Sequence, residues 1–444
     1  MKITSYELRI MNWLFIRHSS FVIRHFTFTC FLLTSAFSYS QSDIIKYART
    51  IVDTLASPSM HGRGYVNKGD SIAADYIKKE FEKLGVKPMG KEFYQKFYFD
   101  VNTFPDRISL SINGKSLTVG KDFIAASYSD GCRGNAKIIF INKKAIKHSE
   151  FVKKISKTHL SDKAFLLDTT GVSIHDLSQV FDKINEADRN PFIYIEKKKF
   201  TSDVTINESG GCCFSVLEKS LPKKPKNISY EIKAKFIPNY QSQNILGYIQ
   251  GTQYPDSFIA FSAHYDHLGR MGKDVYFPGA NDNASGCAML LNLAKHYSQH
   301  PPKYSVAFMA FGAEEVGMLG SKYYVEHPLF PLGQIKFLVN MDIMGTGDEG
   351  IKVVNATEHK KEFDELVRIN SEKNLLAVIS PRGKAANSDH YFFSEAGVKT
   401  FFIYTLGGIK AYHDIYDRPE TLPLTKFQEV FILLTEFTEF LQKK

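Results

Sequence analysis

The stretch 257–267, SFIAFSAHYDH, is an apolar segment that ends in a cluster of polar residues. Its apolar part, 257–263, has the length and composition of a buried strand. His264 follows that strand directly, and Asp266 comes shortly after it. In open α/β sheets, ligands bind at the carboxyl ends of the strands. This stretch therefore predicts a buried strand whose carboxyl end carries residues of a functional site.

The chain on both sides of this stretch, from residue 243 onward, repeats the arrangement of apolar segments and helical patterns. Further strands are predicted at 243–249, 304–310, 335–341 and 399–404, and helices at 284–298, 318–326, 360–373, 389–396 and 424–443. Strands that alternate with helices are typical of an α/β fold. We therefore expect a mixed, mainly parallel central sheet with helices on both faces.

Residues 96–240 have a different pattern. Short alternating or apolar runs at 108–112, 137–141 and 191–195 predict strands, and Gly- and Lys-rich connections separate them. No recognisable catalytic spacing occurs there. We expect a mostly β inserted domain at 96–240, possessing a few helices.

Helical patterns reappear on the N-terminal side of this region, at 43–57 and 68–84. The main α/β domain is therefore predicted to be discontinuous. We expect it to comprise residues 41–95 and 241–444.

Composition and charge limit the partners of the chain. Of its 444 residues, 43% are hydrophobic and 23% charged, as in ordinary globular proteins, and the formal net charge is +9. Lysines gather at 197–199 and at Lys223, Lys224 and Lys226. No aromatic stacking pattern or DNA-reading motif accompanies them, which favours a solvated face over a nucleic-acid surface. We expect no nucleic-acid partner.

The first 40 residues have the pattern of an export signal. Arg17 and Arg24 precede an apolar run at 26–37, and Ser38 and Ser40 follow it. The run has the length of a signal-peptide core and is too short to span a bilayer. A buried N-terminal helix is the alternative. We expect a signal peptide at 1–40, an exported protein, periplasmic or extracellular, and no stable membrane insertion after cleavage.

Four cysteines lie beyond the predicted signal peptide: Cys132, Cys212, Cys213 and Cys287. An oxidising compartment would permit a disulfide, whose pairing the sequence does not specify. Their spacing does not suit a structural zinc site.

Polar residues follow the predicted strands at several places, or precede a helix. They are His264, Asp282, Glu314, Glu315, Asp342 and His413. Each has an ordinary explanation when taken alone, such as a helix cap for Asp282 or a turn residue for Asp342. Their joint placement at one rim of a sheet outweighs those explanations. Carboxylates gathered there would repel one another unless a cation neutralised them, and imidazole with carboxylate suits zinc.

There are enough carboxylates to hold two metal ions that share one bridging carboxylate. The chemistry that follows is metal-assisted hydrolysis, in which a carboxylate that is not a ligand moves the proton of the attacking water. Glu314 and Glu315 could divide these two roles. Asp266 could orient His264 through a hydrogen bond, whereas His267 is expected to be structural or to lie at the margin of the site.

The chain also resembles a known family, the M28 zinc peptidases. The resemblance covers 43–95 and 241–444 and rests on motifs at 62–64 (GRG), 262–269 (SAHYDHLG), 279–286 (GANDNASG), 313–321 (AEEVGMLGS), 340–342 (NMD), 388–390 (SDH) and 412–413 (YH). Phe392 stands where many relatives have proline, which affects the expected contour of the substrate pocket.

The resemblance implies a role for each matching residue. Asp282 would bridge two zinc ions, Glu315 and His413 would complete one site, and His264 and Asp342 would complete the other. Glu314 would be the general base, and Asp266 would orient a ligand. These roles imply an aminopeptidase that releases N-terminal residues from peptide substrates.

Three other functions remain open from the sequence. A glutaminyl cyclase would need a single zinc ion on Asp282, Glu315 and His413. A carboxypeptidase would need a cation such as Arg382 or Arg418 to hold the terminal carboxylate of its substrate. A non-catalytic binding protein could use the same scaffold, although such a protein is expected to lose ligands or the base. The oligomeric state and the preferred residue at the cleaved bond also stay open.

Overall fold

The computed structural model describes residues 43–147, 160–173, 175, 178, 190–208 and 211–443. The expected signal peptide at 1–40 lies outside the described residues. Ala48–Lys444 form one compact unit, and the chain up to Tyr47 is assigned to another. Within the described part, no helix has both the length and the apolar character needed to cross a membrane.

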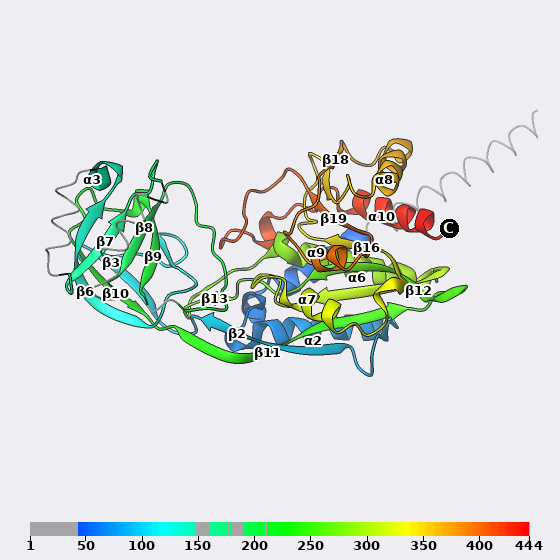
Figure 1. Cartoon of the computed structure of the whole chain (residues 1–444), viewed down its shortest axis with the longest axis horizontal. Helices are drawn as coiled ribbons and strands as arrows, with labels where there is room; N and C mark the ends of the chain where they lie inside the picture. The colour runs from blue at the N-terminus through cyan, green and yellow to red at the C-terminus, as the bar shows by residue number, and fades with distance from the viewer. Residues whose placement is uncertain are drawn as a thin grey trace, which may run out of the picture. The chain divides into compact units, whose positions relative to one another are not determined.

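The central sheet has nine strands (Figure 1). Their order is β1 (Lys87–Pro88), β11 (Lys235–Ile249), β15 (Tyr304–Phe311), β12 (Tyr254–His264), β16 (Ile335–Met341), β19 (Thr400–Thr405), β17 (Ile351–Val354) and β18 (Ile379–Pro381), and β2 (Tyr94–Thr103) also pairs with β11. The strands β15, β12, β16 and β19 are parallel. The flanking strands β11 and β17 are antiparallel to their neighbours β15 and β19. The predicted mixed sheet with a parallel centre is confirmed.

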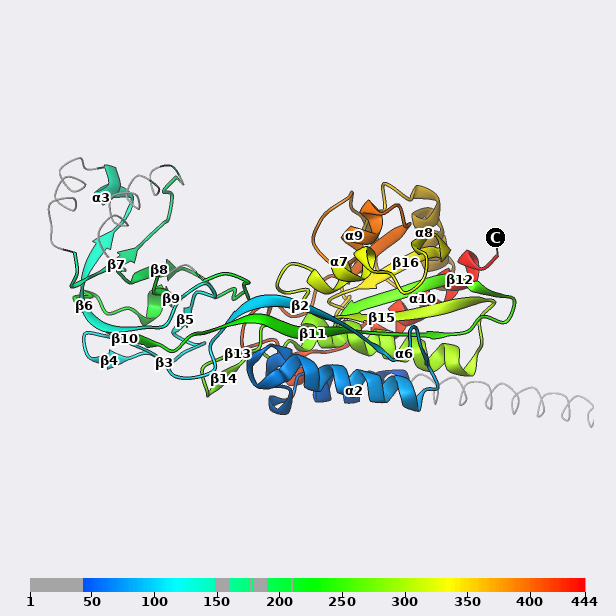
Figure 2. The same cartoon turned by 60° about the horizontal axis from the view of Figure 1, so that its bottom comes forward.

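Helices cover both faces of this sheet. The helices α2 (Gly69–Lys83) and α6 (Gly286–Gln299) lie on one face, and α7 (Leu319–Glu326) and α9 (His390–Glu395) on the other (Figure 2). Two further helices, α8 (Lys360–Lys373) and α10 (Phe427–Leu441), pack against each other. Every residue of β15 is buried, as expected for a central strand that is covered on both sides.

A second, eight-stranded sheet forms within the region predicted to be mostly β. Its order is β4 (Lys115–Ser116), β3 (Ile108–Ile112), β10 (Asn227–Ile232), β6 (Cys132–Ile141), β7 (Lys163–Leu167), β8 (Phe192–Glu196), β9 (Cys213–Leu217) and β5 (Phe123–Ala125). A short helix, α3 (Lys143–Lys147), follows β6. Leu110, Phe123, Ile193 and Phe214 of this sheet are buried in a core cluster that also includes Leu268, Met271, Phe277 and Ile415.

The two long strands β2 and β11 connect the sheets in the sequence. They pair from Tyr94 with Ile245 to Thr103 with Lys235. The predicted limits at residues 96 and 240 fall inside these strands, so the chain leaves the central sheet only after Thr103.

One disulfide joins Cys132, at the start of β6, to Cys212, just before β9. Cys213 and Cys287 are free and buried. The bridge therefore links two strands of the second sheet and has no part in the central one.

Candidate metal centre

The predicted ligands meet at the carboxyl ends of the parallel strands. His264 is the last residue of β12, and Asp342 comes directly after β16. Glu315 lies in the loop that follows β15, and His413 lies beyond β19. Asp282 lies in the irregular turn Ala280–Ser285, immediately before α6. Because parallel strands end at the same edge of a sheet, residues far apart in the sequence share one location.

Asp282 lies between the two predicted halves of the centre. One carboxylate oxygen, Oδ1, is 3.4 Å from His264 Nε2, and the other, Oδ2, is 3.0 Å from His413 Nε2. His264 Nε2 is also 3.4 Å from Asp342 Oδ1, and His413 Nε2 is 3.2 Å from Glu315 Oε2. The structure therefore brings all five predicted ligands together, with Asp282 in the middle.

His267 lies closer to the centre than the sequence indicated. Its Nδ1 is 2.6 Å from Glu315 Oε1, and its ring is fully buried. Two groups of potential metal-binding side chains occur among the described residues: His264, Asp282 and Asp342, and His267, Asp282 and Glu315. The sequence places His267 in the same short stretch as His264, but spacing alone does not distinguish a ligand neighbour from a marginal residue.

The imidazole nitrogens and carboxylate oxygens of this cluster suit a divalent metal ion. Among the described residues, the buried atoms His264 Nε2 and Asp342 Oδ1 have no hydrogen-bond partner, although they lie 3.4 Å from each other. Burial disfavours the charge of Glu315, yet contact with His413 and His267 lowers the pKa of Glu315 to about 2. Burial likewise opposes the charge of His413, while Glu315 and Asp282 raise its pKa to about 11. The gathered carboxylates are thus stabilised by positive charge. The combination of nitrogen and oxygen donors suits zinc.

Glu314 stands beside the ligands. Burial raises the pKa of its carboxyl well above the usual range; nearby His264 opposes that rise, and Glu315 and Asp389 add to it. A carboxylate with a raised pKa is suited to accept and return a proton near neutral pH.

Asp266 acts mainly on the backbone of the Glu314–Glu315 pair. Its Oδ1 accepts a hydrogen bond from the Glu314 N–H at 3.1 Å, and its Oδ2 accepts one from the Glu315 N–H at 3.3 Å. The Tyr65 hydroxyl also donates to Oδ2, at 3.2 Å. The carboxylate is 3.8 Å from His264 Nδ1, which lies nearer to the Asp266 backbone carbonyl, at 3.3 Å. The Asp266 carboxylate therefore orients the loop that carries the two glutamates, and the Asp266 backbone carbonyl is the atom that contacts the His264 ring.

The turn that carries Asp282 is held from one side by a buried arginine. The fully buried Arg63 donates five hydrogen bonds to main-chain carbonyls: those of Leu55, Tyr265, Pro278, Gly279 and Asp282. It thereby joins the end of β12 to the Asp282 turn. Gly279 has φ +58°, and a Cβ there would lie 2.6 Å from the Arg63 guanidinium, so only glycine fits.

The same turn is held from the other side by Asp417. Its carboxylate accepts hydrogen bonds from the N–H groups of Asn281, at 2.8 Å, and Asp282, at 3.0 Å. Burial raises the pKa of Asp417 to about 7, although these two hydrogen bonds oppose the rise. Neither Arg63 nor Asp417 was given a role from residue patterns, because their partners are main-chain atoms that only the fold brings near.

Tyr412 covers the imidazole of His413. The two rings stack with centroids 3.9 Å apart, and the tyrosine is 42% exposed. Burial raises the pKa of Tyr412, and the nearby carboxylates, led by Asp282 and Glu315, raise it further. The phenol is therefore kept protonated beside the centre, where it can donate a hydrogen bond.

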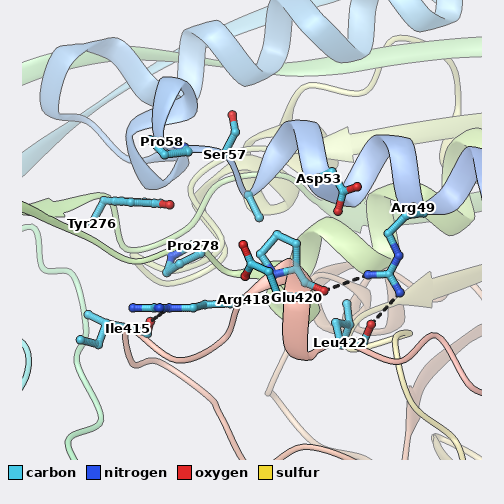
Figure 3. Close-up of a pocket in the computed structure, with 12 residues that line it drawn as sticks. Arg49, Asp53, Ser57, Pro58, Tyr276, Pro278, Ile415, Arg418, Glu420 and Leu422 are labelled. Atoms are coloured by element: carbon cyan, nitrogen blue, oxygen red, sulfur yellow. Dashed lines mark hydrogen bonds between the residues drawn. The ribbon is translucent and has the colours of Figure 1, made fainter.

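A cavity of about 700 Å³ is lined by Arg49, Asp53, Tyr276, Arg418 and Glu420 (Figure 3). None of the predicted ligands lines it. Arg418 Nε donates to the Ile415 carbonyl at 2.8 Å. The second cation considered for a carboxypeptidase, Arg382, donates to the Tyr404 hydroxyl at 3.2 Å. Among the described residues, neither arginine forms an ion pair or hydrogen bond with the carboxylates of the centre, so no observation favours a carboxypeptidase.

Comparison with known proteins agrees with this geometry. Residues 244–438 match the model of peptidase family M28. Aminopeptidase YwaD of Bacillus subtilis is 34% identical over 175 residues, which cover 38% of this chain and 36% of that protein. A probable zinc metalloprotease of Pyrenophora teres is 33% identical over 113 residues, covering 24% of this chain and 23% of that protein. The chain thus aligns with about a third or less of the length of these relatives.

Solved structures share the fold over most of the chain. A zinc aminopeptidase from Bacillus subtilis has a TM-score of 0.68 at 22% identity and covers 90% of this chain and 95% of that one. A peptidase M28 precursor from Shewanella amazonensis has a TM-score of 0.64 at 15% identity and covers 92% of this chain and 97% of that one. The solved structures thus show a shared fold over most of the chain, and the family model shows that residues 244–438 match peptidase family M28.

Proposed function

We propose that the protein is an exported two-zinc aminopeptidase that removes N-terminal residues from peptides. The observation that carries this proposal is the position of Asp282, whose two oxygens face His264 and His413 separately. A carboxylate placed in this way can bridge two ions, with Asp342 on one side and Glu315 on the other. The names of the relatives, aminopeptidase and zinc metalloprotease, support the reaction and the metal.

The chain's own residues supply the proton transfer. Two zinc ions held at the centre would polarise the scissile carbonyl and make a water molecule more acidic. Glu314, whose pKa burial raises, accepts the proton of that water and passes it to the leaving amine. Asp266 fixes the backbone of Glu314 and Glu315 through two hydrogen bonds, so the base and its neighbouring ligand keep their positions during the transfer.

Export is supported by two features. The N-terminal residues have the pattern of a signal peptide, with Arg17 and Arg24 before the apolar run at 26–37. The disulfide between Cys132 and Cys212 is of a kind that persists in oxidising compartments. The periplasm and the extracellular space are both compatible with these features.

Hydrolysis of aminoacyl-nitroanilides and short peptides tests the reaction. We expect the mature protein loaded with zinc to release N-terminal residues, to lose activity with a metal chelator, and to regain it when zinc is added. Product masses identify the bond that is cut. Absence of release, or inhibition only by serine-protease reagents, would contradict the proposal.

A glutamine-initiated peptide distinguishes the single-zinc alternative. A glutaminyl cyclase would remove ammonia from this peptide without cutting a peptide bond, whereas an aminopeptidase would release free glutamine. We expect the second result, together with two zinc ions per chain by elemental analysis.

We expect Tyr412→Phe to lower kcat by about 100-fold, because we propose that the protonated phenol beside His413 donates a hydrogen bond to the oxygen that becomes negative in the transition state. Phenylalanine keeps the ring that stacks on His413. Zinc content and melting temperature should therefore stay at the wild-type values. Steady-state kinetics measure the effect, and a kcat within threefold of wild type would exclude this role.

A further inference from the structure

The loop that carries His413 is bound to a segment from the region between β8 and β9. The Ser202 N–H donates to the His413 carbonyl at 2.9 Å. In return, His413 Nδ1 lies 2.9 Å from the Ser202 carbonyl, which can only accept a hydrogen bond. This reciprocal pair joins a predicted ligand to a residue of the predicted inserted domain.

The pair determines which nitrogen of His413 faces the centre. Because Nδ1–H donates to Ser202, Nε2 is the nitrogen that faces Asp282 and Glu315 and would bind a metal ion there. His413 also has φ +52°, a left-handed conformation that a side chain with a Cβ rarely adopts. The loop therefore needs external contacts to hold this conformation.

Lys199 supplies three such contacts. Its Nζ donates to the carbonyl of Lys410 at 3.1 Å and to that of Tyr412 at 2.9 Å. It also lies 3.3 Å from Asp414 Oδ2, which is largely buried. The lysine thus binds the loop on both sides of His413, whereas its exposed neighbour Lys198 makes no ion pair among the described residues.

The segment that carries these residues is itself fixed. Phe200 is 5% exposed, and the Thr205 carbonyl accepts a hydrogen bond from the Asn102 N–H in β2, at 3.0 Å. Lys199 and Ser202 therefore contact the 410–414 loop from a segment that is anchored by its own packing and hydrogen bonding.

We propose that Lys199 is a positioning residue for the metal centre. It holds the 410–414 loop so that His413 Nε2 points toward Glu315. The inference rests on the proposed two-zinc function. By this inference, Lys199, one residue of the lysine run at 197–199, supports the metal centre through its contacts with the 410–414 loop.

Three variants of the full mature protein test this role. Lys199→Met removes the donor and keeps much of the side-chain length, Lys199→Arg restores a donor, and Lys198→Met is the matched control on the same run. A competitive chelator titration gives the affinity for each zinc ion. Hydrogen–deuterium exchange of residues 408–416 in zinc-free protein reports loop order without metal.

We expect Lys199→Met to weaken one of the two zinc ions by about tenfold and to speed exchange in the loop, with no change in the zinc-free melting temperature. Lys198→Met should stay within twofold of wild type, and Lys199→Arg should recover most of the loss. Equal zinc affinity and equal exchange in Lys199→Met and wild type would overturn the inference. So would an equal loss in Lys198→Met.

The proposed function fails in a different way. In that case the wild-type protein itself would bind no zinc, or would bind two ions and release no N-terminal residue. A wild type that binds no zinc overturns both proposals, whereas an inactive protein with two zinc ions and a weakened Lys199→Met variant leaves the positioning role standing.

Discussion

Replacing Glu314 by glutamine is expected to lower kcat by about 1,000-fold, while the protein keeps its zinc. The amide has the size of the carboxyl group but cannot accept the proton of the attacking water. Among the described residues Glu314 forms no ion pair with His264 or His413, whereas Glu315 lies 3.2 Å from His413 Nε2, so the loss of the Glu314 carboxylate should leave the ligands in place. Steady-state kinetics and elemental analysis of the same sample measure the two effects.

The neighbouring glutamate provides the matched control. Glu315 lies 3.2 Å from His413 Nε2 and 2.6 Å from His267 Nδ1, so Glu315→Gln should lose both zinc and activity. Added zinc should restore part of the activity of Glu315→Gln and none of that of Glu314→Gln. A Glu314→Gln enzyme with kcat within tenfold of wild type would exclude Glu314 as the base.

The central sheet was predictable because its strands are continuous apolar runs. The strand β16 (Ile335–Met341) has the predicted limits, since every position except Lys336 is buried and the run ends at Asp342. The strand β17 (Ile351–Val354) and the edge strand β18 (Ile379–Pro381) were not predicted. They are short, and their pairing with distant residues, which no local pattern reveals, makes them strands.

The ligands were predictable for a related reason. A strand's end fixes where the next polar residue lies, so His264 and Asp342 could be placed from the sequence alone. The contact of His267 with Glu315 could not, because it depends on the path of the chain after β12. The same holds for Ser202, whose main-chain carbonyl meets His413 across a gap of 211 positions in the sequence.

The Asp282 turn shows what the sequence leaves out. Local pattern marks Asp282 as a helix cap or ligand, but it gives no reason for the turn to hold its shape. Arg63 and Asp417 hold it from opposite sides, one by donating to its carbonyls and the other by accepting from its N–H groups. Because both act on main-chain atoms, no residue type in the turn reports them.

Replacing Arg63 by methionine is therefore expected to lower the free energy of unfolding by about 4 kcal/mol. The methionine can fill much of the space, but it leaves five buried carbonyls without their donor. Each such carbonyl loses a charge-assisted hydrogen bond and has no access to water, so the loss is larger than for one surface contact. Urea unfolding of zinc-free protein isolates this effect from that of metal binding.

Arg49 is the matched control for this substitution. It also donates to two carbonyls, those of Pro419 and Leu422, but it is only half-buried, so water can replace it. Arg49→Met should cost about 1 kcal/mol. Arg63→Lys should fall between Arg49→Met and Arg63→Met, because an ammonium keeps the charge and cannot reach five acceptors at once. Equal losses for Arg63→Met and Arg49→Met would show that the buried guanidinium does not hold the Asp282 turn.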